Sequence, residues 1–371
     1  MNVIARRMAG IDASGIRKVF DLAAQMKDPI NLSIGQPDFD VPNELKAIAI
    51  EAIQAGFNKY TQTQGIAELN EAFQRSLRAQ SGGAYTPEAT MVCSGVSGAL
   101  LLLILAVIDS GDEVIFPDPY FVMYKHIINL AGGTPVMLDT YPDFELDPAK
   151  LEAAITPKTK MIIINSPSNP TGVVYGEESL KAVAEIARKK NILVVSDEIY
   201  REFCYDGKFY SIANACPERT VVINGLSKTT AMTGWRIGFA AGPKEIIHEM
   251  IKLQQYTFVC APSFAQKAAV RALELGNIHC AEYAARRDLV CTGLREAGYS
   301  LVKPGGAFYV FPKCPAEEER FVEAVIAKNC LIVPGSVFSE KKGYFRISFA
   351  TDETKLKKGI EILADVMREF S

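Results

Sequence analysis

Short apolar runs, rich in β-branched residues, recur along the chain between longer segments with helical periodicity. Such runs occur at Met91–Cys93, Glu113–Phe116, Pro135–Leu138, Met161–Ile164, Ile192–Val195, Val221–Ile223 and Gly238–Ala241. Between two of them, apolar residues at i, i+3, i+4 and i+7 predict one helix face, formed by Leu180, Val183, Ala184 and Ala187. Strands that alternate with helices predict an α/β fold with a mostly parallel sheet that is sandwiched by helices.

The pattern changes near the C-terminus. There the sequence predicts a pair of strands over 301–311, a helix over 320–329, strands over 331–333 and 344–349, and a closing helix over 354–370. Near the N-terminus it predicts a helix over 14–26 and an extended segment over 29–34, which are too small to fold alone. We therefore expect an N-terminal arm (1–14), a large domain (46–279), and a smaller α+β domain built from 15–45 together with 280–371.

The composition argues against several classes of protein. The 371 residues carry a net charge of −3 and no dense basic stripe, which argues against a general nucleic-acid binder. The segment Met1–Ile11 lacks the apolar core of a secretory signal, and the apolar stretch Ala99–Ile108 is too short to span a bilayer. Eight cysteines without CxxC spacing, alongside three histidines, favour reduced thiols over a zinc site or a disulfide framework. We expect a cytoplasmic protein without nucleic-acid, membrane or metal partners.

Polar side chains with complementary chemistry follow three of the predicted strands. They are Asn169 after the first, Asp197 and Tyr200 after the second, and Lys228 and Arg236 after the third. In an open α/β sheet, ligands bind at the carboxyl ends of the strands. An amide, a carboxylate, a phenol, an amine and a guanidinium at successive strand ends therefore predict one shared binding site.

This set of side chains suits a phosphorylated aromatic aldehyde. Lys228 would form a Schiff base with the aldehyde, which is the usual covalent route to amine chemistry. Asp197 would keep a ring nitrogen protonated, because an opposite charge favours the charged form, and the ring would then act as an electron sink. Asn169 and Tyr200 would hydrogen-bond the phenolate oxygen of the ring.

A phosphate-binding element is predicted just before the apolar helix, which we expect to begin at Ala99. The segment 93–98 offers backbone N–H groups at a helix start, with the hydroxyl of Ser97 as a further donor. Arg236 supplies a cation for the same phosphate. Phe121, or Tyr120 beside it, would cover the face of the ring.

The complete pattern resembles the class I/II aminotransferases, which are fold type I enzymes that depend on pyridoxal phosphate (PLP). The resemblance covers nearly the whole chain and rests on segments 31–39, 59–61, 95–98, 169–172, 196–200, 228–238, 306–309 and 344–348. It implies a PLP-transferase large domain, a homodimer, and transfer of the α-amino group between an L-amino acid and a 2-oxo acid through a Schiff base on Lys228. The substrates would be of the aspartate, alanine or aromatic type.

The resemblance also implies a role for each matched residue. The catalytic residues would be Lys228, Asp197 and Tyr200, and the cofactor would also contact Gly95, Val96, Ser97, Phe121, Asn169 and Arg236. Arg346 would bind the substrate α-carboxylate bidentately, with help from Asn169 and the backbone of Gly35. Tyr60 would reach the phosphate from the partner subunit.

Two positions depart from the pattern of the family. Gly225 stands where many relatives have a serine that donates to the phosphate, so phosphate binding would depend more on the remaining donors. Phe121 stands where several relatives have tryptophan, which leaves stacking intact over a smaller area. As in many members of the family, cis peptide bonds are expected before Pro119 and Pro170.

Each of these residues also has a purely structural explanation. Lys228 alone would be a surface charge, Asp197 could cap a helix, and Gly95 could belong to a plain turn. Arg346 could be a surface charge, but it lies within an apolar run, where an unpaired arginine is costly. The combination favours a binding site over these separate explanations.

Two other functions and the identity of the substrate stay open at this point. The same residues would serve a PLP-dependent C–S lyase or related β-eliminating enzyme, which would release pyruvate and ammonia from a sulfur amino acid. A non-catalytic, effector-binding regulator is disfavoured because no helix-turn-helix pattern or basic extension precedes Ile11, and DNA binding would revive it.

A dicarboxylate substrate would need a second cation, from Lys59, Lys125 or the partner chain. Ile16 and Val19 would instead suit an apolar substrate side chain.

Overall fold

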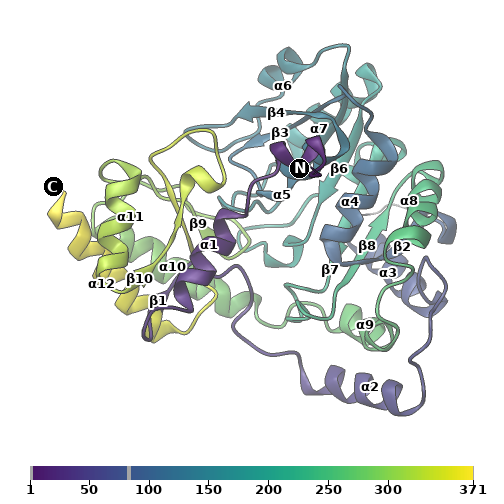
Figure 1. The fold of residues 1–371 in the computed structure, drawn as a ribbon, viewed down its shortest axis with the longest axis horizontal. Helices are drawn as coiled ribbons and strands as arrows, with labels where there is room; N and C mark the ends of the chain where they lie inside the picture. Colours follow the sequence, from purple (N-terminus) through teal and green to yellow (C-terminus); the bar gives the residue numbers. More distant parts are fainter. Residues whose placement is uncertain (1–2, 82–84, 371) are drawn as a thin grey trace.

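A computed structural model describes residues 3–81 and 85–370 of the chain. Its largest sheet has seven strands in the spatial order β2–β8–β7–β6–β5–β3–β4 (Figure 1). The strands are β2 (Thr90–Ser94), β3 (Glu113–Asp118), β4 (Thr134–Asp139), β5 (Thr159–Asn165), β6 (Leu193–Asp197), β7 (Thr220–Gly225) and β8 (Ile237–Ala241). Each apolar run that was predicted to be a strand coincides with one of them to within two residues at either end. β8 runs antiparallel to both of its neighbours, β2 and β7, and every other pair in this sheet is parallel, so the mostly parallel sheet is confirmed.

Helices cover both faces of this sheet. One face carries α4 (Gly95–Val107), α5 (Met123–Ala131) and α8 (Lys244–Thr257). The other carries α6 (Pro148–Ala154), α7 (Glu177–Lys190), α2 (Asn43–Gln54), α3 (Ala67–Ser81) and α9 (Ser263–Leu275). Alternate residues of a central strand serve the two layers, since Met161 packs on the first face and Ile162 on the second. Burial on both faces makes the ends of these strands a rigid platform.

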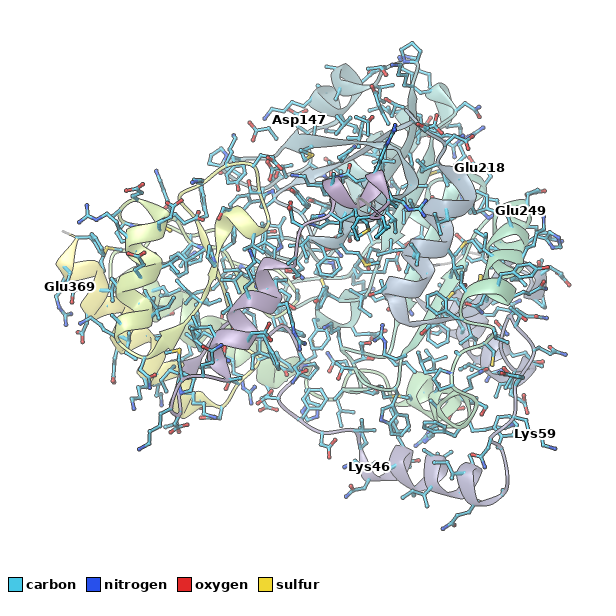
Figure 2. All side chains as sticks on the ribbon, in the orientation of Figure 1. Lys46, Lys59, Asp147, Glu218, Glu249 and Glu369 are labelled. Carbon is cyan, nitrogen blue, oxygen red and sulfur yellow. The ribbon has the colours of Figure 1, made fainter. Side chains whose placement is uncertain are left out.

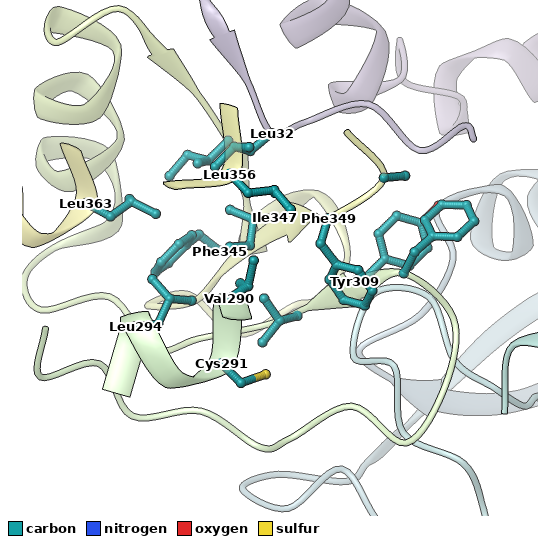
Figure 3. Packing of buried hydrophobic residues seen from close by; sticks show 14 of the residues in the cluster. Leu32, Val290, Cys291, Leu294, Tyr309, Phe345, Ile347, Phe349, Leu356 and Leu363 are labelled. Atoms are coloured by element: carbon teal, nitrogen blue, oxygen red, sulfur yellow. The ribbon is translucent and has the colours of Figure 1, made fainter. Parts of the chain in front are cut away.

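The C-terminal part of the chain builds two smaller sheets. β1 (Ile30–Asn31) pairs in parallel with β10 (Cys330–Leu331), and β11 (Val333–Pro334), β12 (Phe345–Ser348) and β9 (Tyr309–Val310) form an antiparallel sheet. The helices around them are α10 (Cys280–Glu296), α11 (Glu318–Ala327) and α12 (Glu353–Glu369), which confirms the two helices predicted here to within two residues. Figure 3 shows Phe345 and Ile347 of β12 clustered with Val290 of α10 and Leu356 of α12.

Two predictions for this region are wrong. The sequence predicts a strand pair over 301–311, but within this segment only β9 is a strand. The backbone N–H groups of Gly306 and Ala307 donate instead to carbonyl groups of loops that follow the large sheet, at Gly172 and Phe203. The single strand predicted over 331–333 is divided at Ile332 into β10 and β11, which belong to different sheets.

The helix predicted near the N-terminus is present as α1 (Gly15–Ala23), which is shorter than the predicted 14–26. In Figure 1 it is the purple helix between the yellow C-terminal helices and the blue-green sheet. It contacts β11, but none of its residues is buried. The helix therefore lies against the folded chain without entering its core.

Charged side chains stand out from the edges of the molecule, as Lys46, Lys59, Glu218 and Glu369 show in Figure 2. Within the described residues, no helix is long and apolar enough to cross a lipid bilayer. The division into an arm (1–14), a large domain (46–279) and a small domain (15–45 with 280–371) stays a prediction.

Candidate active site

A cavity of about 340 Å³ opens at the carboxyl ends of the central strands. Asn165 ends β5 and Asp197 ends β6, and both line the cavity together with Lys228, which follows β7. This is the edge at which open α/β sheets bind their ligands, and the volume lies in the range of small-molecule sites. The binding site predicted at the strand ends therefore corresponds to a real hollow in the fold.

Most of the residues that the sequence nominates meet in this cavity. They are Gly35, Val96, Ser97, Phe121, Asn169, Asp197, Tyr200, Lys228, Arg236 and Arg346. Gly95 lies directly behind the wall, against the guanidinium of Arg236. Tyr60 is the exception, because it lies outside the cavity.

The side-chain amine of Lys228 donates a hydrogen bond to the carbonyl oxygen of Gly35 over 2.7 Å. Burial lowers the pKa of Lys228 from 10.5 to about 8, because the protein interior disfavours the charged form. The positive charges of Arg346 and Arg236 contribute to this decrease, and the carboxylate of Asp197 opposes it. Near neutral pH, the nucleophilic neutral amine is therefore far more abundant than in a solvated lysine.

The carboxylate of Asp197 is buried at the end of β6. The hydroxyl of Tyr124 donates to its Oδ2 over 2.7 Å, and the backbone N–H of Ile199 donates to its Oδ1 over 3.3 Å. Burial raises the pKa of Asp197 to about 6, and these two hydrogen bonds act in the opposite direction. Both donors are neutral groups, so a cationic ring nitrogen would be a suitable partner for this carboxylate.

The helix after β2 begins at Gly95, so the predicted start at Ala99 is wrong. Gly95 has a φ of 70°, which glycine adopts without strain. A Cβ atom there would lie 2.3 Å from Nη2 of Arg236, so only glycine allows the guanidinium to lie this close to the helix start. No side chain caps this end of α4, which leaves first-turn N–H groups such as those of Val96 and Ser97 available to an anion.

Arg236 completes this anion site. Its guanidinium donates to the backbone carbonyl groups of Thr233 over 2.9 Å and Ser94 over 3.5 Å. Within the described residues these acceptors include no carboxylate. Arg236 also has a φ of 56°, in the left-handed region that residues other than glycine seldom adopt and that tends to occur at functional sites.

Arg346 is held inside the protein by β12, with 1% of its surface exposed. Its Nη1 donates to Oδ1 of Asn169 over 3.0 Å and its Nη2 to the carbonyl oxygen of Ser33 over 2.8 Å, while its Nε is buried without a partner. The guanidinium carbon lies 4.4 Å from the ring centroid of Tyr309 and 4.6 Å from that of Phe338. A buried guanidinium with neutral partners is well suited to receive a carboxylate in a forked arrangement.

The hydroxyl groups of Tyr200 and Tyr309 lie 2.8 Å apart, and Tyr309 also donates to the carbonyl oxygen of Gly35 over 3.4 Å. This chain of contacts connects the end of β6 with β9 and with the segment that accepts from Lys228. The Asn169–Pro170 and Asp118–Pro119 bonds are cis, as expected, and so are Ser166–Pro167 and Tyr141–Pro142.

The two aromatic candidates for covering the ring are separated by the structure. Phe121 lines the main cavity, whereas Tyr120 is buried against Phe116 with the ring centroids 4.9 Å apart. Tyr60 lies in a separate surface depression with Lys59, and 83% of its surface is exposed. The described residues of this chain therefore place Tyr60 outside the main cavity.

Some residues that shape the site are missed by the sequence reasoning. Tyr124 lies three residues after Phe121 at the start of a helix, a spacing that places both on one side of it and is the available signal. Asn165 donates to the carbonyl oxygen of Asp197 over 3.0 Å and accepts from the backbone N–H of Asn169 over 2.8 Å. Its position at the end of β5 is the signal in that case.

The structure also shows which of the suggested cations and apolar residues line the cavity. Lys125 forms an ion pair with Glu340 over 2.7 Å, and neither Lys125 nor Lys59 lines the cavity. Ile16 lines it as suggested, but Val19 does not, and Phe20 does so in its place. The i, i+4 spacing of Ile16 and Phe20 on one helix face would have revealed this pair.

The residues present fit pyridoxal phosphate. The cavity combines an amine that is partly neutral near pH 7, a buried carboxylate that accepts only from neutral donors, and an uncapped helix start beside a guanidinium that donates to backbone carbonyl groups. These groups correspond in chemistry to an aldehyde, a ring nitrogen and a phosphate, respectively. Among the described residues, the cavity therefore offers a chemically suitable side chain or backbone group to each of these parts of the cofactor.

Comparison with known proteins agrees with this chemistry. Residues 27–363 match the family described as aminotransferase class I and II. The chain is 42% identical to an aspartate aminotransferase of Pyrococcus abyssi, over 98% of each chain. It is 39% identical to an aromatic-amino-acid aminotransferase of Thermococcus litoralis, over 99% of this chain and 98% of the relative.

The fold has an equally close counterpart among solved structures. The aspartate aminotransferase of Thermus thermophilus with maleate superposes with a TM-score of 0.95 and 38% identity, over 99% of this chain and 100% of that one. Sequence and fold thus agree over essentially the whole length. The chain belongs to the class I and II aminotransferases, and it is a pyridoxal-phosphate-dependent aminotransferase.

Proposed function

We propose that the chain transfers the α-amino group between an L-amino acid and a 2-oxo acid, with Lys228 as the residue that holds the cofactor covalently. One observation carries this proposal. The amine of Lys228, with its pKa lowered to about 8, shares a cavity with the buried carboxylate of Asp197 and the guanidinium groups of Arg236 and Arg346. An amine, an acid and two anion-binding groups in one hollow match a phosphorylated aldehyde together with an amino-acid carboxylate.

Each contact to the cofactor is assigned by the chemistry of the side chain. The aldehyde carbon would be held by Lys228, the ring nitrogen by Asp197, the phenolate oxygen by Asn169 and Tyr200, the ring face by Phe121, and the phosphate by Gly95, Val96, Ser97 and Arg236. When bound, pyridoxal phosphate supplies an electron sink that weakens the bonds at the substrate α-carbon. The remaining steps depend on residues of the chain.

Arg346 and Lys228 have different roles toward the substrate, which are carboxylate binding and proton transfer. The guanidinium of Arg346 binds the α-carboxylate in a fork, with Asn169 and the backbone of Gly35 beside it, and so fixes the orientation of the α-carbon. The amino group of the substrate would displace the Nζ of Lys228 from the aldehyde carbon. The freed neutral Nζ would then take the proton from the α-carbon and later return it as a general acid. The lowered pKa of Lys228 makes the neutral base available near pH 7.

We further propose a homodimer in which Tyr60 reaches the phosphate of the partner's site. Exposed apolar side chains support this assembly, because 83% of Tyr60 and 85% of Tyr256 are accessible to solvent. A Cβ at Gly98 in α4 would lie 3.6 Å from the ring of Phe258, which is itself partly exposed. The exposed apolar surface therefore adjoins the helix that begins at the phosphate site.

Mixing two inactive variants tests this arrangement. Lys228→Ala removes the reacting amine, and Tyr60→Ala removes the group that is supplied across the interface. Mixed dimers should contain one site in which both residues are intact, so activity should return when the two proteins are refolded together or exchange subunits. Failure of complementation in demonstrated mixed dimers would contradict the role of Tyr60.

The substrate range proposed for the chain follows its relatives, which are named for aspartate and for aromatic amino acids. Amino-group exchange tests the reaction itself. Holoenzyme would receive single amino acids with 2-oxoglutarate or pyruvate, and the new amino acid and new oxo acid should form in equal amounts. Release of pyruvate and ammonia from a sulfur amino acid, without consumption of the acceptor, would contradict amino-group transfer. The cytoplasmic location stays a prediction.

A further inference from the structure

We propose that Glu198 and Arg201 are positioning residues for the cofactor, because their buried ion pair holds the end of β6 so that Asp197 and Tyr200 can meet the ring of pyridoxal phosphate. This inference rests on the proposed function, which assigns Asp197 to the ring nitrogen and Tyr200 to the phenolate oxygen. It adds two residues that do not line the cavity and that act only through their neighbours.

The order of residues at the end of β6 is the first observation. Asp197 directly precedes Glu198, and Tyr200 directly precedes Arg201. Both residues of the pair are buried, with 0% of Glu198 and 5% of Arg201 exposed. Side chains of this kind are seldom buried so completely unless they are paired. Two buried charges therefore lie one residue away from the two side chains assigned to the ring.

A hydrogen bond of Glu198 passes behind Asp197. Successive residues of β6 face opposite sides of the sheet, since Val194 packs on the second face and Val195 on the first. By the same alternation, Ser196 lies on the second face and Asp197 on the first. The hydroxyl of Ser196 donates to Oε1 of Glu198 over 3.0 Å. This bond joins the residues on either side of Asp197 and so restrains the backbone that carries it.

Glu198 is in turn attached to other parts of the chain. Its Oε1 also accepts from the hydroxyl of Ser211. Its backbone N–H donates to the carbonyl oxygen of Ile223 in β7 over 2.8 Å. One buried carboxylate therefore connects the end of β6 with the neighbouring strand and with a later loop. Such a network favours a single arrangement of the groups that it joins.

Arg201 attaches the same segment to the helical layer. Its Nη1 lies 3.5 Å from Oε2 of Glu198, and its Nη2 donates to the hydroxyl of Ser76 in α3 over 2.9 Å. In the part of the chain that the structure describes, Oε2 and Nη1 have no hydrogen-bond partner, so the two charges depend on each other. A buried ion pair commonly contributes little net stability. Its presence directly after Tyr200 therefore favours a role in geometry.

Glu198 also influences the charge of Asp197. Burial raises the pKa of Asp197 to about 6, and the negative charge of Glu198 adds to this increase. The hydroxyl of Tyr124, the backbone N–H of Ile199 and the amine of Lys228 act in the opposite direction. Removing the charge of Glu198 should therefore lower the pKa of Asp197.

The groups around Glu198 decide how far its own carboxyl group is ionised. Burial raises the pKa of Glu198, whereas the guanidinium of Arg201 and the hydroxyl groups of Ser211 and Ser196 lower it. The phenol of Tyr85 is the other titratable group nearby, and burial together with Glu198 raises its pKa. Among these neighbours, only Arg201 supplies a positive charge that keeps Glu198 ionised.

Pyridoxine phosphate is the probe for the position of the ring. It carries an alcohol instead of the aldehyde, so it binds without forming a Schiff base with Lys228. Inorganic phosphate is the reference, because its binding depends on the helix start and on Arg236 but not on the end of β6. Both affinities would be measured on the apoprotein by isothermal titration calorimetry at pH 8, where Asp197 is ionised.

Glu198→Gln removes the charge of the pair with almost no change in volume. We expect pyridoxine phosphate to bind about tenfold more weakly, which is the lower end of the loss seen when outer partners of metal ligands are removed. Inorganic phosphate should bind as in the natural protein. Unchanged affinity for pyridoxine phosphate, or an equal loss for both probes, would overturn the proposal.

The matched control is Glu318→Gln. Glu318 is also buried, with 2% of its surface exposed, and it accepts from the backbone N–H groups of Ser336 and Gly343 in the small sheets' region. The substitution makes the same chemical change away from Asp197. Both affinities should stay unchanged, and a loss like that of Glu198→Gln would mean that any buried carboxylate has this effect.

The pH dependence separates positioning from general support of the fold. Asp197 must be ionised to hold the ring nitrogen, so affinity for pyridoxine phosphate should fall as the pH decreases through the pKa of Asp197. In Glu198→Gln that pKa is lower, so the decrease should occur at a lower pH than in the natural protein. Titration of the free ligand is common to both proteins and cancels in the comparison. An identical or higher midpoint in the variant would contradict the proposal.

Ser196→Ala provides an independent test, because Glu198→Gln leaves the guanidinium of Arg201 buried without its counter-charge, which destabilises a fold. The alanine variant removes only the bond behind Asp197, and pyridoxine phosphate should bind about threefold more weakly. Thr220→Val is the control, since it removes a buried hydroxyl that donates to the carbonyl oxygen of Cys216 over 2.8 Å at the start of β7. Equal affinities in the two variants would overturn the proposal.

The natural protein separates a failure of this inference from a failure of the proposed function. If it binds pyridoxal phosphate on Lys228 but Glu198→Gln and Ser196→Ala bind pyridoxine phosphate normally, only the positioning role is wrong. If the natural protein binds neither pyridoxal phosphate nor pyridoxine phosphate, the proposed function itself is wrong.

Discussion

The two walls of the active-site cavity differ in how firmly the fold holds them. On one side, Asn169, Asp197 and Lys228 follow central strands of a sheet that helices cover on both faces. On the other side, α1 lies on the surface with no buried residue, and 45% of Phe20 is exposed. The proposed cofactor and proton-transfer chemistry thus depends on residues of the rigid wall, whereas Ile16 and Phe20 of α1 line the cavity from the loosely packed side.

The difference has an energetic basis. Residues at the strand ends are positioned by fully buried neighbours, so moving them would disrupt the core. The helix α1 contributes little buried apolar surface, so its displacement costs little of the free energy of unfolding. Substitutions on the rigid wall should therefore affect catalysis strongly, whereas those on α1 should have little effect on stability.

The largest effect is expected for Lys228→Ala. Loss of the group that holds the cofactor and moves the α-proton should reduce kcat about 10⁴-fold, the upper end for general acid–base catalysis. Steady-state exchange kinetics measure the loss. Lys357→Ala, which removes a surface lysine of α12 paired with Glu353, should leave kcat unchanged. A Lys228→Ala protein with near-normal turnover would show that the rigid wall does not carry the chemistry.

Arg346→Ala should come next. Removing one member of a buried charge pair costs about 2–5 kcal/mol, so the KM for the amino acid should rise roughly 30-fold or more. The affinity for pyridoxal phosphate should stay nearly constant, because Arg346 is assigned to the substrate. Arg236→Ala should show the reverse pattern and weaken the cofactor. Titration of each apoprotein with pyridoxal phosphate, combined with kinetics, distinguishes the two, and equal loss in both variants would contradict the division of tasks.

Tyr124→Phe should have an intermediate effect that depends on pH. The hydroxyl of Tyr124 donates to Asp197 and thereby lowers its pKa, so removing the donor should raise that pKa above about 6. A hydrogen bond to a charged group contributes about 1.5–3 kcal/mol, which corresponds to roughly one to two pH units. Because the ionised carboxylate of Asp197 is proposed to bind the ring nitrogen, affinity for pyridoxal phosphate should fall as pH decreases, and should do so at a higher pH in the variant.

The matched control for this experiment is Tyr309→Phe. Its hydroxyl contacts Tyr200 and Gly35 rather than Asp197. The pH at which cofactor affinity falls should therefore be the same as in the natural protein. Identical pH profiles for Tyr124→Phe and the natural protein would show that Tyr124 does not control the charge of Asp197.

The smallest effect on stability is expected on α1. Phe20→Ala should change the free energy of unfolding by no more than about 0.5 kcal/mol, because the side chain is half exposed. Phe116→Ala, at a fully buried position of β3, should cost about 3–5 kcal/mol. Urea unfolding of both variants measures the contrast. Similar losses would mean that α1 is as much a part of the core as the large sheet.

The rigid wall was also the part that the sequence predicted best. Its strands are apolar runs buried on both faces, and each run ends in a polar residue such as Asp197 whose chemistry is distinctive. Tyr124 was missed because its role depends on a helix turn that brings it to Asp197 from another part of the chain. The start of α4 was placed at Ala99 because the uncapped glycine start at Gly95 gives no capping signal in the sequence.

Prediction was weaker where hydrogen bonds do not follow regular elements. The segment 301–311 has two apolar runs separated by Pro304, Gly305 and Gly306, as in a strand pair, yet the backbone N–H groups of Gly306 and Ala307 donate to loops after β5 and β6. For α1, periodicity indicated a helix, but the surface covered by its apolar face depends on tertiary packing. The proposed role of Tyr60 depends on a second subunit, and one chain cannot test that expectation.

The central claim is that the Nζ of Lys228 binds pyridoxal phosphate covalently opposite Asp197. The most direct test is borohydride reduction of the cofactor-loaded protein, followed by proteolysis and mass spectrometry of the peptides. We predict one added phosphopyridoxyl group per chain, on Lys228 alone. A group attached to another lysine, or no attachment in protein saturated with pyridoxal phosphate, would contradict the account.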